Sequence, residues 1–285
     1  MEEKEKEYTG WRKWTPTDEE LVNLYQFNEC PLDLKENEYL IVMDRTDDTV
    51  ASTYKMKKGK LEKVDRAPIK IKDPKDGRTN KVYNPRNPEQ VCAFDLIHDD
   101  SITIKLITGY WGTGKTLLLV AGALEALRAK KFEKIVWVRN NVDVKDTKDI
   151  GALPGDLYTK LEGFLGPFID HVGDKAKVKK MIDEGQLEIE PLQTLRGRNI
   201  ENAIIICSEA ENLTKEHIQL IIARAAEGSA VWFDGDCRQR DKKAFENSKG
   251  LETMIKRFAG EELFGFTKLI KTERSKTAAM ADKLD

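Results

Sequence analysis

One glycine-rich stretch, Gly109–Thr116, has the residue types and spacing for phosphate chemistry. Its sequence, GYWGTGKT, matches the phosphate-loop pattern G-x-x-x-x-G-K-[ST]. Glycines let the backbone bend so that its N–H groups wrap a triphosphate, Lys115 would reach the β- and γ-phosphates, and Thr116 would offer its hydroxyl to Mg²⁺. We expect every residue of the stretch to bind the nucleotide: Gly109, Tyr110, Trp111, Gly112, Thr113, Gly114, Lys115 and Thr116.

The residues around this stretch favour a phosphate loop over a chance glycine turn. Ile102–Thr108 is a short apolar, β-branched run, and Leu117–Lys131 is rich in helix formers. A strand, a glycine loop and a helix in this order are the context in which the motif binds phosphate, because the helix start adds a partial positive charge. The sequence therefore predicts a site for a nucleoside triphosphate.

A second apolar strand, Ala203–Cys207, is followed by Ser208 and Glu209. Nucleotide hydrolases usually have Asp-Glu here, where the aspartate holds the Mg²⁺ shell and the glutamate polarises the attacking water. We predict that Glu209 polarises this water; an acid at a helix start is the alternative. Ser208 is neutral and a weaker magnesium ligand than a carboxylate. The predicted metal ligands are Thr116, Ser208 and Glu209.

A third apolar strand, Ala230–Asp234, runs into the string Gly235-Asp236-Cys237-Arg238-Gln239. This G-D-x-x-Q string resembles the γ-phosphate sensor of helicases, in which Gln239 would report the state of the nucleotide. Its place after the two nucleotide motifs strengthens this interpretation.

The chain from about Asn84 to its C-terminus resembles the ATPase domain of PhoH-like proteins, which are RecA-like nucleotide hydrolases related to superfamily 1 helicases. The resemblance covers about 200 of the 285 residues, and these further strings carry it in the family's order: Asn84–Gln90, Ile150–Leu157, Leu195–Arg198, Glu209–Asn212 and Glu273–Ser275. It implies that Gln90 contacts the adenine edge and that Arg274 stabilises the transferred phosphate. The predicted catalytic set is then Lys115, Glu209, Gln239 and Arg274.

Three features depart from that family. Ser208 replaces the family's aspartate, which affects metal affinity and turnover, and Asn140 stands where a proline usually follows Arg139. Longer members carry an N-terminal PIN nuclease domain, which we expect this chain to lack, together with any metal nuclease activity. Residues 38–81 resemble the small β segment that precedes the ATPase in those members.

The order of the elements predicts the fold class. From residue 84 apolar strands alternate with helices, which indicates an α/β, RecA-like P-loop NTPase with a parallel sheet between helices. Before it we expect a helix that starts near 15–18, with proline in its first turn, and a small basic β-rich subdomain with strands at 38–44, 50–56 and 61–72. The domain boundary is placed after residue 82, which gives 1–82 and 83–285. The later strands are expected at 102–108, 134–139, 187–190, 203–207 and 230–234. A helix capped by Asn87 is expected within 84–100, and further helices at 115–129, 155–172, 175–184, 213–226 and 249–258.

The composition is typical of a soluble protein, with 40% hydrophobic and 34% charged residues. No apolar run approaches the roughly 18 residues of a membrane helix, and the N-terminus does not resemble a signal peptide, so we expect a cytoplasmic protein. The cysteines are scattered and have no histidine beside them, which predicts buried free thiols instead of zinc or disulfides: Cys30, Cys92, Cys207 and Cys237.

The charge is segregated, although the net charge is only −2. Residues 1–50 carry 6 basic and 14 acidic side chains, and residues 51–86 carry 12 basic and 4 acidic ones. The basic stretch either follows a nucleic-acid backbone or is a lysine-rich solvated hairpin. The sequence leaves both interpretations open.

Several other residues have two interpretations. Arg224 is either a second candidate for the role of Arg274 or a solvated helix arginine. Arg196 and Arg198 contact either phosphate or RNA, and Trp111 either stacks on a base or packs under the loop. The isolated histidines are expected to be ordinary surface or core residues: His98, His171 and His217.

These observations lead to three hypotheses about function. The first is a Mg²⁺-dependent ATPase that couples hydrolysis to movement on RNA or single-stranded nucleic acid, as a homo-oligomer for which the resemblance implies a hexameric ring. The second, motivated by Ser208, is an ATP-binding switch or assembly module with little turnover. The third is a small-substrate kinase, which shares the phosphate loop but is disfavoured by the G-D-x-x-Q string and Arg274.

Overall fold

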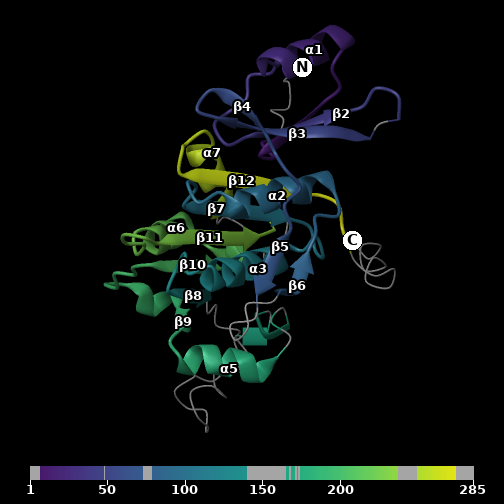
Figure 1. The fold of residues 1–285 in the computed structure, drawn as a ribbon. Helices are drawn as coiled ribbons and strands as arrows, with labels where there is room; N and C mark the ends of the chain where they lie inside the picture. Colours follow the sequence, from purple (N-terminus) through teal and green to yellow (C-terminus); the bar gives the residue numbers. More distant parts are fainter. Residues whose placement is uncertain are drawn as a thin grey trace, which may run out of the picture. The chain divides into compact units, whose positions relative to one another are not determined.

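The computed structural model divides the chain into two compact units (Figure 1). Unit 1 consists of Met1–Ile69, Val82–Gly114 and Glu252–Asp285, and unit 2 consists of Lys70–Lys81 and Lys115–Leu251. The structure describes residues 7–47, 49–72, 79–139, 165–166, 168–170, 172, 174–236 and 249–273.

Unit 1 contains a four-stranded N-terminal sheet with the order β1-β2-β3-β4. β1 and β2 are parallel, whereas β2, β3 and β4 are antiparallel neighbours. A tight turn joins the last two strands, in which Lys58 and Gly59 both have positive φ, as the sequence KKGK predicts. The strands are β1 (Trp11–Trp14), β2 (Tyr39–Met43), β3 (Val50–Lys57) and β4 (Lys60–Lys63).

The small N-terminal β sheet is therefore confirmed, with two corrections to its strands. The four-residue strand β1 was not predicted, because so short a run shows no clear alternation. The strand predicted over 61–72 is wrong, since β4 ends at Lys63 and β5 (Ile69–Lys72) starts only after Pro68. β5 pairs instead with β6 (Thr79–Tyr83), in a region expected to be only a turn.

Helix α1 (Asp18–Phe27) connects β1 to β2 and starts at a capping box. The backbone N–H of Glu20 donates to Thr17 Oγ1 at 3.3 Å, and the N–H of Thr17 donates to Glu20 Oε2 at 2.7 Å. Pro16 therefore precedes the cap. The prediction that it lies in the first turn of the helix is wrong. Leu24 of α1 packs with apolar residues of the sheet, among them Leu40, Val42, Tyr54 and Leu61.

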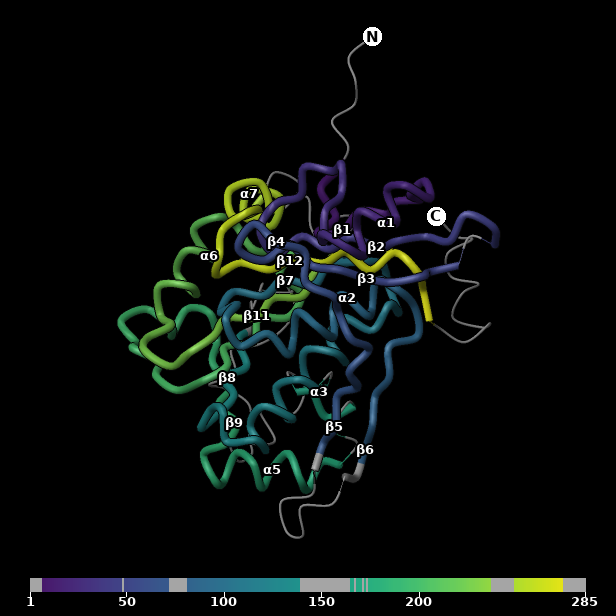
Figure 2. Tube along the Cα trace, turned by 45° about the horizontal axis from the view of Figure 1, so that its top comes forward, coloured from purple at the N-terminus to yellow at the C-terminus, as the bar shows by residue number. Residues whose placement is uncertain are grey.

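The N-terminal sheet docks onto helix α2 (Pro88–His98) and strand β12 (Phe264–Leu269) of the same unit. The two views show β12, in yellow, beside the purple and blue N-terminal strands (Figure 1, Figure 2). Trp11 Nε1 donates to the carbonyl of Lys268 at 2.8 Å, and Asn37 Nδ2 donates to the carbonyl of Phe264 at 3.0 Å. A Cβ at Gly10 would lie 1.9 Å from the carbonyl oxygen of Phe266, so only glycine allows this approach.

β12 was not predicted, yet it completes the strand pairing of unit 1. It runs parallel to β7 (Ile104–Gly109), with Leu269 opposite Gly109. Its sequence, FGFTKL, follows helix α7 (Gly250–Phe258) after a short turn. The sequence predicted this helix but no strand after it.

The larger sheet has six strands in the order β12-β7-β11-β10-β8-β9. Its last four strands belong to unit 2, in which β10 pairs in parallel with both β11 and β8, and β8 pairs in parallel with β9. Every residue of β10 and β11 is buried, which is typical of parallel strands covered on both faces. The four strands are β8 (Lys134–Arg139), β9 (Leu187–Pro191), β10 (Ala203–Cys207) and β11 (Ala230–Gly235).

Helices cover these strands within each unit. α2 packs on β7 and β12 in unit 1, α3 (Lys115–Arg128) packs on β11 and β8 in unit 2, and α5 (Lys175–Asp183) packs on β9. Short 3-10 turns at Leu192–Leu195 and Ala210–Asn212 follow β9 and β10. The parallel α/β fold of a RecA-like P-loop NTPase, preceded by a small β sheet, is thus confirmed.

Two predicted helices need comment. The helix over 155–172 lies largely outside the described residues. Helix α6 (Lys215–Ile222) ends four residues before the predicted Ala226, because the following backbone bonds to another segment. The N–H of Ala226 donates to the carbonyl of Ile200 at 2.8 Å, and the N–H of Ile200 donates to the carbonyl of Arg224 at 2.9 Å.

Candidate functional site

The glycine-rich stretch forms a tight loop between β7 and α3. Gly109, Gly112 and Gly114 all have positive φ, at 153°, 67° and 92°. A Cβ at Gly109 would lie 2.3 Å from the carbonyl oxygen of Leu269, so the strand end also requires glycine. The hydroxyl of Thr113 donates to the carbonyl of Tyr110 at 2.9 Å and closes the loop on itself. This is the strand, loop and helix order that the motif predicts.

The start of helix α3 has no acidic residue in its own first turn, which begins at Lys115. Lys115 and Thr116 are half-buried, and Trp111 in the preceding loop is 41% exposed. The backbone N–H groups and the dipole at a helix start favour an anion, and a triphosphate supplies one.

Two motifs beside the loop in unit 1 hold it in place. Asn87 caps α2 by accepting the N–H of Gln90, and Gln90 Nε2 donates to the carbonyl of Thr113 at 3.1 Å. Glu273 donates its backbone N–H to the carbonyl of Gly112 at 3.1 Å, and its Oε1 accepts Nδ2 of Asn87 at 2.9 Å. The predicted adenine segment and the start of the predicted E-R-S element therefore both contact the phosphate loop.

Glu209 follows β10 in a backbone conformation that non-glycine residues rarely adopt. Its φ of 56° and ψ of 41° lie in the left-handed region, while its side chain is exposed. Residues held in this region are often found at functional sites, where the surrounding structure compensates the cost. Here the N–H of Glu209 donates to Oδ1 of Asp234 on the neighbouring strand at 3.1 Å.

Asp234 was not among the predicted site residues, although it lies beside Glu209. It is 2% exposed, and its Oδ2 is buried without a hydrogen-bond partner among the described residues. Burial raises the pKa of this carboxyl above its usual range, and the N–H of Glu209, the charge of Lys115 and a hydrogen bond from the Thr116 side chain offset this rise only in part. The available signal was an acid at the end of an apolar strand, directly before the G-D pair.

Glu211 and Asp236 extend this group of acids in unit 2. Glu211 Oε2 accepts the N–H of Asp236 at 3.1 Å, and burial together with the charge of Asp234 raises the pKa of Glu211 to about 8. A Cβ at Gly235 would lie 2.8 Å from Oε2 of Glu211, so glycine permits the close approach. We call Glu209, Glu211, Asp234 and Asp236 the acid cluster.

Several predicted residues lie outside the described part of the chain. Their roles therefore stay predictions. The residues outside the described part are the sensor Gln239, the finger Arg274, Asn140, Cys237, His171 and the string Ile150–Leu157. The other three cysteines are free, as expected: Cys30, Cys92 and Cys207.

The arginines considered for phosphate or RNA have mostly internal contacts. Arg198 forms ion pairs with Glu190 and, at 2.9 Å, with Glu188, both on β9. Arg224 donates from Nη1 to the carbonyl of Arg198 at 3.3 Å. These bonds anchor the loop before β10.

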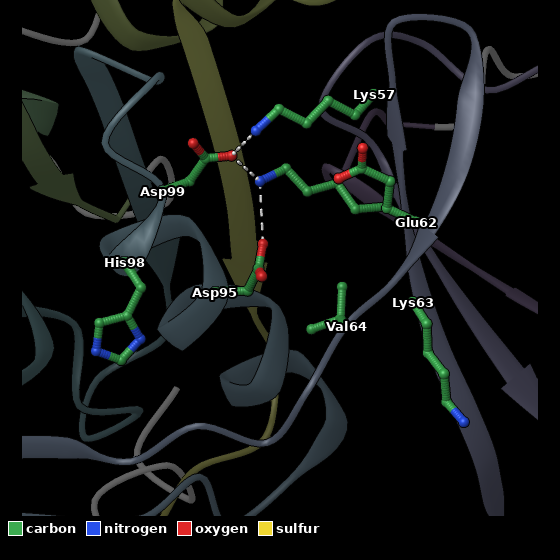
Figure 3. Close-up of a pocket in the computed structure, with 8 residues that line it drawn as sticks. Lys57, Glu62, Lys63, Val64, Asp95, His98 and Asp99 are labelled. Atoms are coloured by element: carbon green, nitrogen blue, oxygen red, sulfur yellow. Dashed lines mark hydrogen bonds and ion pairs between the residues drawn. The ribbon is translucent and has the colours of Figure 1, made fainter.

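A second group of charges lies at the docking contact in unit 1, and we call it the docking cluster (Figure 3). Lys55, which is 4% exposed, pairs with Asp95 at 3.0 Å and with Asp99 at 2.5 Å, and Lys57 pairs with Asp99 at 2.9 Å. Burial would raise the pKa of Asp99, but hydrogen bonds from Lys55, Ser101 and Lys57 outweigh it and hold the pKa well below its usual range. Two lysines of the predicted basic stretch are thus used internally.

No group of three or more His, Cys, Asp or Glu residues that could hold a metal alone occurs in the part of the chain that the structure describes. Magnesium beside nucleotides is usually held by one or two protein oxygens together with phosphates and water. Thr116, Ser208 and Glu209 remain the predicted ligands, and Oδ2 of the nearby Asp234 has no hydrogen-bond partner among the described residues. Within the same described residues, no helix is long and apolar enough to cross a membrane.

Most of the chain is similar to known proteins. The family model described as PhoH-like protein matches residues 82–282. Protein PhoH2 of Bacillus subtilis (strain 168) is 35% identical over 209 residues, and Protein PhoH2 of Mycolicibacterium smegmatis is 30% identical over 206 residues. Each alignment covers 70% of this chain but only 47% and 46% of the relative, so the chain spans about half the length of these proteins.

Proposed function

We propose that this chain, which belongs to the PhoH-like protein family, binds ATP with Mg²⁺ and hydrolyses it, and that hydrolysis drives movement on RNA or single-stranded nucleic acid. The observation that carries the nucleotide part is the closed glycine loop that leads into a helix start with no acid in its first turn. Few arrangements other than phosphate binding require this combination.

The chemistry follows from the side chains around that loop. A water polarised by Glu209 attacks the γ-phosphorus in line, the bond to the β–γ bridging oxygen breaks, and ADP and inorganic phosphate leave. Lys115 neutralises charge that develops on the transferred group, and Arg274 and Gln239 would act at the same phosphate. When bound, Mg²⁺ would neutralise the β- and γ-oxygens, and Thr116, Ser208 and Glu209 would hold it.

The left-handed backbone of Glu209 supports its assignment as the residue that orients water. The hydrogen bond from its N–H to Asp234 fixes the turn, while the side chain stays exposed. A strained residue with an accessible carboxylate is expected where a side chain must face a substrate.

The adenine preference and the assembly follow from the family. Gln90 lies against the loop through Thr113, where the family reads the base. One ATPase core per chain implies that strand movement needs a homo-oligomer, for which a hexameric ring is the expected form. The basic stretch at residues 51–86 would offer a nucleic-acid contact through the lysines that the docking cluster does not use.

The experiment is phosphate release by the wild type with and without single-stranded RNA and DNA. We expect nucleic acid to stimulate release and Glu209→Gln to lower it by about 10²- to 10⁴-fold, as removal of a general base does. A matched control is Glu216→Gln, which changes an exposed acid on α6. Absence of stimulation by either nucleic acid would remove the nucleic-acid part of the proposal.

A switch with little turnover is the second candidate, favoured by Ser208 at the position of the family's aspartate. In that case Glu209→Gln changes almost nothing, because there is little activity to lose, and Ser208→Asp raises phosphate release strongly. The same set of variants therefore separates the hydrolase from the switch.

A further inference from the structure

The buried carboxylate of Asp234 has one oxygen that the protein leaves unsatisfied. Oδ1 accepts the N–H of Glu209 at 3.1 Å, which accounts for the turn after β10. Oδ2 is fully buried and has no hydrogen-bond partner among the described residues, although Asp234 is 2% exposed. A charged oxygen in that situation is costly unless a cation or donor meets it.

The surroundings of Asp234 show what kind of group would meet Oδ2. The charge of Lys115 and the side chain of Thr116 both act on this carboxylate. These two residues begin helix α3 and are the ones that a phosphate loop uses for the phosphates and for Mg²⁺. Asp234 therefore belongs to the place where a magnesium–triphosphate complex would bind.

The strand register relates Asp234 to the missing aspartate. Cys207 of β10 is paired with Phe233 of β11 in a parallel arrangement, so Ser208 and Asp234 directly follow this pair on neighbouring strands. Residues at matched positions of parallel strands face the same side of the sheet, about 4.8 Å apart. The carboxylate of Asp234 thus lies one strand away from the place where an aspartate at position 208 would have its carboxylate.

We propose that Asp234 supplies the carboxylate of the magnesium site, in place of the aspartate that Ser208 replaces. This assignment rests on the proposed ATP site and changes its metal ligands. Oδ2 of Asp234 and the hydroxyl of Thr116 are the protein oxygens that face the ion, while Oδ1 keeps the turn that carries Glu209. The absence of an aspartate at 208 is then no sign of a weak metal site.

The structural alternative is a buried aspartate that only fixes the turn at Glu209. That role needs Oδ1 alone, and Asp234→Asn preserves an oxygen acceptor there while it removes the charge from Oδ2. This substitution therefore separates the two roles.

The test measures the affinity for Mn²⁺, by electron paramagnetic resonance, and for Mg²⁺, by fluorescence of a labelled non-hydrolysable ATP analogue bound to the full chain. We expect Asp234→Asn to weaken metal affinity by about 10- to 100-fold. The exchange variant Ser208→Asp/Asp234→Asn should recover most of this loss, since it returns the carboxylate one strand away. Asp95→Asn, which changes an acid of the docking cluster, should leave metal affinity unchanged.

The outcomes separate this assignment from the function on which it rests. Failure of the wild type to bind the labelled nucleotide overturns the ATP site itself. Nucleotide binding with unchanged metal affinity in Asp234→Asn overturns only the assignment of Asp234. Thermal unfolding checks that each variant is folded; if Asp234→Asn is not, the exchange variant carries the test, and a metal affinity far below that of the wild type in that folded variant counts against the assignment.

Discussion

The docking cluster and the acid cluster both bury carboxylates, but they treat the charge in opposite ways. In the docking cluster, Lys55 and Lys57 meet Asp95 and Asp99 directly, and the pKa of Asp99 is held well below its usual range. In the acid cluster, burial raises the pKa of Glu211 to about 8, and Oδ2 of Asp234 has no hydrogen-bond partner in the described structure.

This difference indicates that the two clusters have different roles, one in stabilising a contact and one in attracting a cation. Charges that are paired within the protein stabilise a contact, here between the N-terminal sheet and helix α2. A buried charge whose partners do not offset the cost of its burial destabilises the fold and favours a cation that neutralises it. The predictions below separate these two purposes, from the largest expected effect to the smallest.

Lys55→Met should have the largest effect, because it removes the central cation of the docking cluster. Asp95 and Asp99 would keep their charges in a partly buried place, and breaking such a pair costs about 3–5 kcal/mol. The measurement is the free energy of unfolding in urea at neutral pH, and the affinity for the ATP analogue should be unchanged. A loss below about 1 kcal/mol would show that this cluster is only a surface feature.

Glu211→Gln should change how stability depends on pH. The pKa of Glu211 is raised to about 8 in the folded chain, so its ionisation weakens folding, and the associated stability is complete below about pH 4.5 and lost as the pH rises through 8. We expect the unfolding free energy of the wild type to fall by about 2–4 kcal/mol between pH 5 and 9, and the variant to lose most of this dependence.

The docking cluster predicts the opposite dependence at acid pH. Because the pKa of Asp99 is depressed, its contribution is present above the usual aspartate pKa and is lost as the pH falls through the lower folded value. Glu227→Gln, which changes an exposed acid after α6, serves as a control that should alter neither the acid nor the alkaline part of the curve. Identical curves for Glu211→Gln and the wild type would contradict the assigned pKa.

Lys57→Met should have the smallest effect. Its side chain is 26% exposed, and its ammonium shares Asp99 with Lys55, which stays in place. We expect a loss of at most about 1 kcal/mol in the free energy of unfolding, measured as for Lys55→Met. A loss as large as that of Lys55→Met would mean that both lysines are equally necessary, and that burial does not set the difference.

Local signals in the sequence were sufficient for much of the fold. The glycine loop, the cap of α2 at Asn87 and the apolar run of β10 each determine their own element, and the structure has them where they were expected. The conformation of the predicted phosphate loop was predictable for the same reason, since the loop is one continuous stretch of chain.

Features that depend on distant contacts were not predictable. β12 becomes a strand by pairing with β7, from which it is about 160 residues away, and β1 exists because it pairs with β2. Arg198 read equally well as a phosphate or RNA ligand until its pairs with Glu188 and Glu190 were seen. Asp234 carried no role because its neighbours in space, Thr116 and Lys115, come from another part of the sequence.

The central proposal, that the chain binds a magnesium–ATP complex at its glycine-rich stretch, is tested most directly by titration calorimetry of a non-hydrolysable ATP analogue with Mg²⁺. We expect one nucleotide per chain for the wild type. Lys115→Ala should weaken affinity by at least about 30-fold, since it removes a charged partner of the phosphates. No heat of binding to the wild type, or equal affinity in Lys115→Ala, would contradict the claim.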